Sequence, residues 1–503
     1  MNNQPKNTRS DFLEMNSDEF REVGHRLIDD IISFTEDIPN KPITKADTVG
    51  VLREALSLRP LPEEGTELQE LMAHTTNLLI DHSLFNGHPG FMGYITASAA
   101  PAGALADLLA ATINPNCGAG ILSPIATEIE NQTIQWLAEL IGYNSDAGGV
   151  LVSGGNLANF TGFLAGRTAK APIDLKEKGL AGLDKPMTVY CSKGTHTWIE
   201  KAAILFGHGS EAVRWIPYNE NYQMDNEKLE LAIVSDIEAG FQPFMIVGTA
   251  GDVSTGKVDD LNGISEISKK YDLWFHIDGA YGVPAATLPE LKETFKGLES
   301  ADSIALDPHK WLYCPLEAGG VLVKNRQDLI NAFSSHPEYY NFDAGPDQPS
   351  VNFYEYGLQN SRGFRALKVW IALQQAGRSG YQTLIREDIQ LSELLFDLAD
   401  NHAELEAVTQ SLSITTFRYL PEEVPTDSEA GVKYLNELNE TLLNEIASGG
   451  EMFLSNAIID GNYCLRSCIV NFRTNQQTIY DLIKIVIQKG QELHKSLRNN
   501  HGF

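Results

Sequence analysis

The chain has 503 residues and carries 38 Lys and Arg against 67 Asp and Glu, so its formal net charge is −29 with His neutral. This negative charge argues against binding to nucleic acid or to an anionic membrane surface. Hydrophobic residues make up 43% of the chain and charged residues 21%, as in ordinary globular proteins. Neither a disordered nor a fibrous protein fits this composition, and the length predicts two to four domains.

The 5 cysteines are widely spread and include no CxxC pair, so the sequence predicts neither a disulfide framework nor a metal site. The polar start, MNNQPKNTRSDF, has no apolar stretch of signal-peptide length, and no run of about 18 apolar residues occurs. The Ala-rich segment 98–113 comes closest, but Pro101 and Asp107 interrupt it, and its length predicts a buried helix. We expect a cytoplasmic protein without membrane contact.

Two helices are predicted near the N-terminus. Apolar residues recur at helical spacing over residues 16–35, with Asn16 or Ser17 available as N-cap, and a second helix is predicted near 68–84. Residues 37–66 are rich in Pro, Asp and Glu and show little periodicity. They are predicted to be a connector that either wraps a neighbouring subunit or is a plain exposed linker.

From residue 148 to about 324, short apolar runs alternate with helical stretches. The predicted strands are GVLVS, MTVYC, VRWIP, FMIVGTA, LWFHID, DSIAL and GGVLVK, with helices starting near Asn156, His196, Asn226 and Asp260. This alternation predicts an α/β fold whose mostly parallel sheet has helices on both faces. A long helix from about 361 to 401, strands near 412–420 and 463–472, and further helices predict a small α+β domain.

Residues that follow the strands are candidates for ligand binding, because ligands bind beyond the carboxyl ends of strands in open α/β sheets. Residues 153–156 (SGGN) can bind a phosphate with backbone N–H groups. The alternative is that the two glycines only allow the turn from strand to helix. Asp278 follows another strand and could pair with a cationic ring nitrogen, while Gly279 and Ala280 would let a flat ring approach. An Asp that caps the next turn is the alternative.

Lys310 lies in DPHKW, between two predicted strands, where a solvated surface charge is hard to explain. Such a lysine is suited to forming a Schiff base with an aldehyde. His196 follows the strand MTVYC and could stack on a ring, or simply cap a helix. A phosphate cradle, an acid for a ring nitrogen and an enclosed lysine are together the parts that a pyridoxal phosphate enzyme needs.

A competing motif lies at residues 251–257 (GDVSTGK), which have the glycine and lysine spacing of a nucleotide-binding P-loop. Val258 replaces the Ser or Thr that would bind magnesium, and residues 258–260 are predicted to be a turn and cap rather than the start of a helix. The sequence therefore disfavours nucleotide binding.

At these residues the chain resembles the group II pyridoxal-phosphate-dependent amino acid decarboxylases, which include aromatic-L-amino-acid, glutamate and cysteine sulfinate decarboxylases. The likeness runs through MNSDEFREVGHRLID, HPGFMGYITAS, SPIATEIE, GGVLVSGGNLANF, HIDGAYG, DPHKWLY, NSRGFRALKVW and LRSCIVNFRT. It implies a fold-type-I homodimer with a seven-stranded sheet, shared active sites and pyridoxal 5′-phosphate as cofactor. The expected divisions are a helical segment 1–95 that wraps the partner, a cofactor-binding α/β domain 96–360 and a small domain 361–503.

The resemblance also implies residue roles. Lys310 carries the cofactor as a Schiff base, Asp278 pairs with its ring nitrogen, and His196 and Ala280 lie on its two faces. The other implied cofactor-binding residues are Gly154, Gly155, Asn156, His309 and Thr249. The family often has Asn where this chain has Asp307, and Thr where it has Asp252, so the roles of these two acids stay open.

Residues 335–351 match a mobile loop of relatives that enters the partner's active site, and Tyr339 falls where they carry a tyrosine that protonates the substrate carbon, with Tyr340 the adjacent alternative. The implied substrate-binding residues are Asn86, Tyr94, Ile95 and Thr96. A roomy pocket segment without a cluster of Arg or Lys favours decarboxylation of an aromatic L-amino acid. The alternatives are an acidic or diamino substrate (glutamate, cysteine sulfinate or diaminobutyrate) and an aldehyde synthase.

Two further alternatives are an aminotransferase or desulfurase of the same fold and a catalytically silent scaffold. DPHKW and the Tyr339 loop argue against the first. The presence of Lys310, Asp278 and His196 argues against the second.

Overall fold

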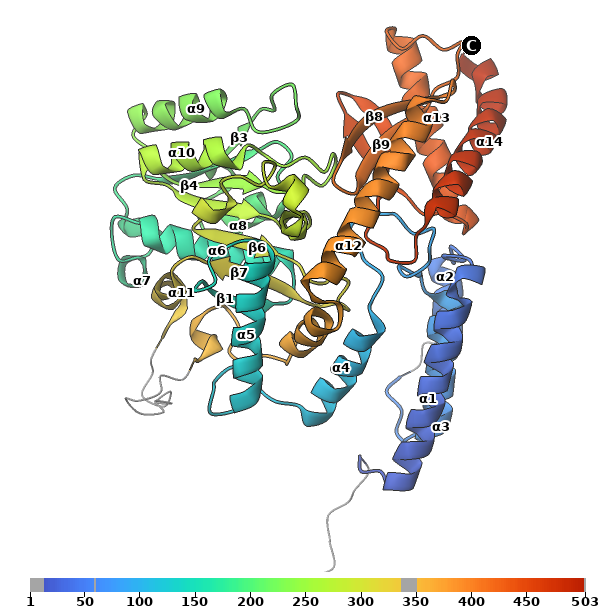
Figure 1. Cartoon of the computed structure of the whole chain (residues 1–503), viewed down its shortest axis with the longest axis horizontal. Coiled ribbons are helices and arrows are strands. Elements are labelled where there is room, and N and C mark those ends of the chain that lie inside the picture. Colours follow the sequence, from blue (N-terminus) through green and yellow to red (C-terminus); the bar gives the residue numbers. More distant parts are fainter. Residues whose placement is uncertain (1–12, 58–59, 336–350, 502–503) are drawn as a thin grey trace, which may run out of the picture.

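The computed structural model describes residues 13–57, 60–335 and 351–501. Figure 1 shows two parts side by side, one built on a large sheet and one on a small sheet, with helix α12 (Ala366–Asp400) running between them. A third, N-terminal part is helical and projects from the body. Within the described residues, no helix combines the length and the apolarity needed to cross a membrane.

The large sheet has seven strands in the order β1-β7-β6-β5-β4-β2-β3. Only β7 runs antiparallel to its neighbours, so the other six strands point the same way. All seven predicted strands are confirmed: β1 (Gly148–Val152), β2 (Met187–Ser192), β3 (Val213–Ile216), β4 (Gln242–Thr249), β5 (Trp274–Asp278), β6 (Ser303–Leu306) and β7 (Gly319–Val323). Their side chains are almost all buried, as expected for a sheet covered on both faces.

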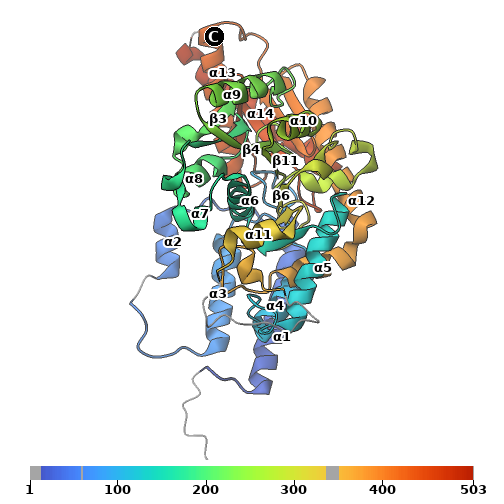
Figure 2. The ribbon, with the colours of Figure 1, turned by 90° about the vertical axis from the view of Figure 1, so that its left-hand side faces the viewer.

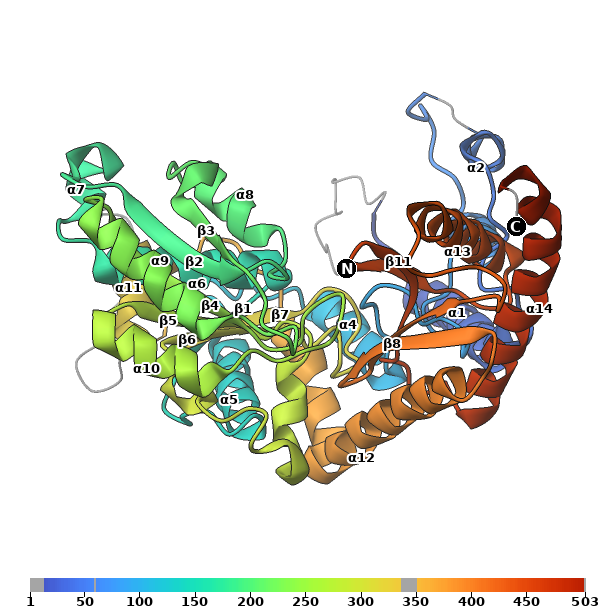
Figure 3. The same cartoon turned by 90° about the horizontal axis from the view of Figure 1, so that it is seen from above.

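Helices cover both faces of this sheet (Figure 3). They are α5 (Pro124–Leu140), α6 (Gly155–Lys170), α8 (Trp198–Leu205), α9 (Asn226–Glu238), α10 (Leu261–Tyr271) and α11 (Arg326–Phe333), while the one-turn helix α7 (Leu175–Lys178) lies in the connection between α6 and β2. Helix α6 lies directly on the strands because its small residues allow a close approach: a Cβ on Gly162 would lie 2.7 Å from the ring of His276, and one on Gly166 would lie 2.6 Å from Trp274. The four predicted helix starts agree with the structure to within two residues.

The small sheet is antiparallel, in the order β10-β11-β9-β8. Its strands are β8 (Leu405–Ser411), β9 (Ile414–Tyr419), β10 (Ser455–Ile459) and β11 (Asn462–Cys468), and its helices are α12, α13 (Glu429–Gly449) and α14 (Gln476–His501). The predicted strands correspond to β9 and β11. The two that were not predicted, β8 and β10, lie at the sheet edges and mix buried with partly or fully exposed residues, which weakens their pattern.

The N-terminal part contains α1 (Ser17–Asp37), α2 (Val49–Leu56) and α3 (Leu68–His82). The prediction for α1 is confirmed, since the Asn16 side chain accepts hydrogen bonds from the second and third residues of the helix. The predicted connector over 37–66 contains a helix that was not predicted, α2, with Thr48 as its N-cap. Helices α1 and α3 lie side by side away from the body (Figures 1 and 2), and α1 buries none of its residues.

Helix α4 (Pro101–Ile113) corrects the prediction of a buried helix over 98–113. Only Gly103 and Ala106 are buried, and Gly103 packs closely against the segment before β7, since a Cβ on it would lie 2.3 Å from Pro315. The larger apolar side chains face outward, with exposed fractions of 59%, 52%, 49% and 62% for Leu105, Leu108, Leu109 and Ile113.

Asp388 in α12 connects the small part to the segment that follows β6. Its Oδ2 accepts hydrogen bonds from the indole N–H of Trp311 at 2.9 Å and from the hydroxyl of Tyr313 at 2.6 Å. Burial raises the pKa of this carboxyl to about 7, although the two donors oppose the shift. The residues just after Lys310 are therefore anchored on α12.

We expect Asp388→Asn to gain stability relative to the wild type as the pH rises. The carboxyl has a pKa of about 7 in the folded protein and about 4 in an unfolded chain, so the folded state binds its proton more tightly. The wild type therefore loses stability as the pH rises from about 4 to about 7. The amide does not titrate, and its oxygen can accept both hydrogen bonds. The unfolding free energy of the variant minus that of the wild type should increase by about 2 kcal/mol between pH 5 and pH 7, as measured by urea unfolding.

The matched control is Asp400→Asn, an exposed position at the end of α12 with the same change of charge. Its effect on stability should not depend on pH. A stability difference for Asp388→Asn that stays constant over the same pH range would contradict the prediction.

Candidate active site

The carboxyl ends of β1, β4, β5 and β6 lie at one edge of the large sheet, because these strands run in parallel. A cavity of about 550 Å³ opens at this edge. Its lining includes every residue predicted to bind the cofactor: Gly154, Gly155, Asn156, His196, Thr249, Asp278, Ala280, His309 and Lys310. The structure thus brings together side chains that lie far apart in the sequence.

Lys310 lies on the segment between β6 and β7. The side chains of Trp311 and Tyr313 are buried and anchor this segment, and Trp311 also stacks on Tyr281 with ring centroids 5.0 Å apart. The Lys310 side chain is 22% exposed, and its Nζ lies 3.2 Å from Oδ2 of Asp307. The lysine therefore reaches the cavity from a rigid support with a carboxylate beside it.

Asp278 is the last residue of β5 and is buried. Its Oδ2 accepts a hydrogen bond from the indole N–H of Trp198 at 2.7 Å, and its Oδ1 accepts one from the backbone N–H of Ala280 at 3.3 Å. These two donors fix the carboxylate at the cavity wall. Trp198 was not singled out in the sequence, and its position two residues after His196 was the one available signal.

His196 precedes α8, and its Nδ1 accepts the backbone N–H of Trp198 at 3.3 Å, so the imidazole also acts as a cap. Loss of water from part of the ring lowers its pKa; among the weaker influences, Lys310 also lowers it, while Asp278 and Asp307 oppose the shift. The ring is therefore neutral near pH 7. A neutral imidazole at the cavity wall can stack on a flat ring and can exchange a proton.

The start of α6 forms a cradle of backbone donors. The N–H of Gly155 donates to Oδ2 of Asp307 at 3.0 Å, and a Cβ on Gly155 would lie 2.7 Å from that oxygen, so the position requires glycine. His309 accepts the N–H of Ala318 on its Nδ1 at 3.0 Å. Burial lowers the pKa of His309, so its ring is neutral and carries its hydrogen on Nε2, toward Asp307.

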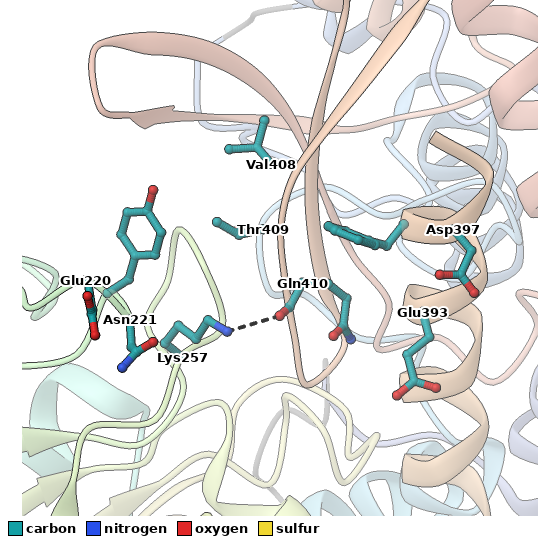
Figure 4. Close-up of a pocket in the computed structure, with 10 residues that line it drawn as sticks. Glu220, Asn221, Lys257, Glu393, Asp397, Val408, Thr409 and Gln410 are labelled. Carbon is teal, nitrogen blue, oxygen red and sulfur yellow. Dashed lines mark hydrogen bonds between the residues drawn. The ribbon is translucent and has the colours of Figure 1, made fainter. Parts of the chain in front are cut away.

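The P-loop alternative fails in the structure. Asp252 folds residues 251–257 into a closed turn by accepting the N–H groups of Ser254 and Thr255. No helix follows directly, since α10 begins at Leu261 after its cap Asp260. Figure 4 shows Lys257 pointing into a different cavity, of about 420 Å³, where its Nζ donates to the backbone oxygen of Gln410 at 3.4 Å.

Of the four predicted substrate-binding residues, one lines the cavity and three do not. Ile95 lines the cavity. Tyr94, Thr96 and Asn86 are not among its lining residues; Tyr94 is 64% exposed, and its backbone oxygen accepts a hydrogen bond from Arg466. Tyr339 and Tyr340 lie outside the described residues.

Four apolar residues that the sequence did not single out line the cavity beside Ile95. They are Leu157 and Phe160 on α6, Val253 in the turn after β4, and Leu316 in the segment before β7. No motif marks them, because any apolar residue at these positions would look like part of the core.

Residues 53–419 match the family model described as the pyridoxal-dependent decarboxylase conserved domain. The chain belongs to the pyridoxal-dependent decarboxylase family. The aromatic-L-amino-acid decarboxylase of Bacillus atrophaeus is 30% identical over 485 residues, which cover 96% of this chain and 98% of that protein. Tryptophan decarboxylase 2 of Oryza sativa subsp. japonica is 31% identical over 465 residues, which cover 90% of this chain and 91% of that protein.

Solved structures have the same fold. The tryptophan decarboxylase of Catharanthus roseus in complex with L-tryptophan is 25% identical with a TM-score of 0.86, covering 96% of this chain and 100% of that one. The Oryza sativa TDC structure with PLP and tryptamine has a TM-score of 0.88 at 23% identity, covering 96% and 99%. The predicted fold-type-I architecture is thereby confirmed. This pyridoxal-dependent decarboxylase is a carboxy-lyase that uses pyridoxal 5′-phosphate and acts on an amino acid.

The residues present fit this cofactor. The cavity holds an amine at Lys310, a carboxylate at Asp278 and, at its edge, the glycine cradle at the start of α6. Asp307 also keeps a buried Oδ1 without a hydrogen-bond partner. An aldehyde, a ring nitrogen and a phosphate thus each have a suitable group.

Proposed function

We propose that the protein removes the carboxylate of an aromatic L-amino acid as carbon dioxide and releases the amine. The apolar wall of the cavity, formed by Ile95, Leu157, Phe160, Val253 and Leu316, carries this proposal. Among the described lining residues Lys310 is the only Lys or Arg, so a side-chain carboxylate would have no second cation to pair with. An aromatic side chain would bury its area against this wall. The names of the two curated relatives above support the same substrate class.

We propose that Lys310 holds the cofactor covalently, that Asp278 holds a proton on its ring nitrogen and that His196 covers one face of its ring. When bound, pyridoxal 5′-phosphate supplies an electron sink for the pair released as the bond between Cα and the carboxylate breaks. The anionic Asp278 favours the protonated nitrogen because opposite charges attract at short range. The remaining cofactor contacts are assigned to Gly154, Gly155, Asn156, His309, Ala280 and Thr249.

The proton that replaces the carboxylate must be delivered to Cα. We assign this delivery to Tyr339, with His196 as its helper, and we assign a substrate contact to Ile95, which lines the cavity. Asn86, Tyr94 and Thr96 do not line it, so their proposed substrate contacts require the active site that a second copy of the chain would share. The resemblance of the 335–351 segment supports the role of Tyr339. The neutral state of His196 supports its role, since a neutral imidazole can accept and return a proton near pH 7.

We also propose a homodimer, with residues 1–95 wrapping the partner, 96–360 forming the cofactor-binding domain and 361–503 the small domain. Helix α1 buries none of its residues, and α4 exposes its larger apolar side chains. Both observations support a second copy of the chain that packs against these surfaces. A cytoplasmic location is supported by the five cysteines, which are all free thiols.

Release of carbon dioxide from a panel of amino acids tests the proposed function. We expect kcat/KM for L-tryptophan, L-tyrosine or L-phenylalanine to exceed that for L-glutamate, cysteine sulfinate and 2,4-diaminobutyrate by about 100-fold or more, because an unpaired buried charge is costly. A preference for an acidic or diamino substrate would contradict the proposal.

Carbon dioxide is released in both reactions, so amine release is separated from aldehyde formation by identifying the organic product and assaying hydrogen peroxide after the same reaction in air. Aldehyde formation is tested because the chain is also similar to the phenylacetaldehyde synthase of a Rosa hybrid cultivar, with 27% identity over 489 residues. Amine as the main product supports the proposal. Aldehyde and hydrogen peroxide as the main products would favour the synthase.

A further inference from the structure

Asp307 places a carboxylate in the cradle assigned to the cofactor's phosphate. It follows β6 directly, and its side chain is only 1% exposed. Its Oδ2 accepts the N–H of Gly155 at 3.0 Å and lies 3.2 Å from Nζ of Lys310. Its Oδ1 is buried without a hydrogen-bond partner, and a Cβ on Gly319 would lie 2.7 Å from it. A backbone donor at the start of α6 therefore already has an anionic partner.

The cavity offers little positive charge to balance a second anion. Lys310 is the only Lys or Arg among its described lining residues. Both imidazoles that face Asp307, those of His309 and His196, have pKa values lowered mainly by burial, so they are neutral near pH 7. Lys368 on α12, whose charge also acts on His309, pairs with Asp107 at 3.0 Å. Once Lys310 is joined to the cofactor, Asp307 and a phosphate would share the cradle without a dedicated counter-charge.

We propose that Asp307 occupies the phosphate cradle in the cofactor-free protein and that the phosphate enters together with one proton, shared between the Asp307 carboxyl and a phosphate oxygen. Two ionised oxygens at hydrogen-bond distance repel each other strongly where water is scarce, whereas one proton turns the repulsion into a hydrogen bond. Affinity for the phosphate form of the cofactor therefore weakens as the pH rises. Asp307 is a positioning residue in this scheme, and the inference rests on the proposed function because it takes the cradle as the phosphate site.

Calorimetric binding of pyridoxamine 5′-phosphate to the full-length, cofactor-freed chain tests this proposal, since this compound forms no covalent link to Lys310. Titration at pH 8 in two buffers of different ionisation enthalpy counts the protons taken up. We expect the wild type to take up about one proton more than Asp307→Asn. We expect Asp307→Asn to bind about tenfold tighter or more at pH 8, with the gap closing toward pH 6.

The matched control is Asp302→Asn, which removes the same charge at the opposite end of β6, where the carboxylate accepts the N–H of Phe275 at 2.8 Å. It should bind with the proton count and affinity of the wild type. Pyridoxamine, which lacks the phosphate, should bind the wild type with about one proton fewer than pyridoxamine 5′-phosphate. This comparison needs no variant and stands even if Asp307→Asn fails to fold.

Two failures are distinguishable. Equal proton counts for the wild type and Asp307→Asn, or for the two compounds on the wild type, with the phosphate form still preferred, would overturn the role of Asp307 alone. Equal affinity of the wild type for pyridoxamine and its phosphate would overturn the cradle itself, and with it both the assigned contacts and the inference.

Discussion

Lys310→Ala is expected to lose covalent attachment of the cofactor and to retain less than about one thousandth of the wild-type rate of carbon dioxide release. Lys310 provides the only amine among the described residues that line the cavity, so no neighbouring side chain can replace it as a nucleophile. Borohydride reduction followed by mass spectrometry of the peptides should find the cofactor on the peptide containing residue 310 in the wild type and nowhere in the variant. The rate is measured with the cofactor in excess.

Lys257→Ala is the control for this experiment. The Lys257 ammonium points into a separate cavity and donates to a backbone oxygen, so its loss should leave attachment and rate unchanged (Figure 4). It also tests the P-loop alternative, which needs this lysine. Turnover by Lys310→Ala at the wild-type rate, or cofactor on another peptide, would refute the assignment of Lys310.

Asp278→Asn is expected to lower kcat about 100-fold to 1,000-fold while leaving the fold intact. The amide oxygen can still accept the Trp198 N–H, and only the longer hydrogen bond from the Ala280 N–H, at 3.3 Å, is lost. A neutral amide cannot favour a proton on the ring nitrogen as a carboxylate does, which weakens the electron sink in the transition state more than in the ground state. Steady-state kinetics at saturating cofactor, with circular dichroism as a check on the fold, measure this effect.

Asp272→Asn provides a control near the amino end of β5. Asp272 is 94% exposed on its side chain, has a positive φ that Asn tolerates, and pairs with Lys170 at the surface, so its loss should cost little. If kcat of Asp278→Asn stays within about fivefold of the wild type, the assigned role of Asp278 is wrong.

The sequence predicted the large sheet because its strands are short, continuous apolar runs that contrast with the helical stretches between them. It also predicted the residues around the cavity, since parallel strands bring the residues at their carboxyl ends to one edge. Asp278 and Lys310 could therefore be placed at one site, because each comes at or after the end of a strand of the same open sheet.

Other features depend on contacts that a linear pattern does not contain. The hydrogen bond from the indole of Trp198 to the carboxylate of Asp278 joins positions 80 residues apart in the sequence. The length of segment 98–113 predicted a buried helix. Whether the exposed leucine face of α4 is covered depends on a second molecule, which the sequence pattern of one chain does not contain. The edge strand β10 is short and half exposed, so its pattern could not be told from that of a loop.

The pairing of β1 with β7 has a consequence for how the protein is made. Gly148 pairs with Val323 and Val152 with Gly319, so among the described strands the one neighbour of β1 lies far downstream in the chain. At a typical elongation rate, roughly 10 to 30 seconds pass on the ribosome between the synthesis of the two strands. During that time an entirely apolar strand has no partner, and the nascent chain depends on helix packing or on chaperones to shield it until β7 emerges.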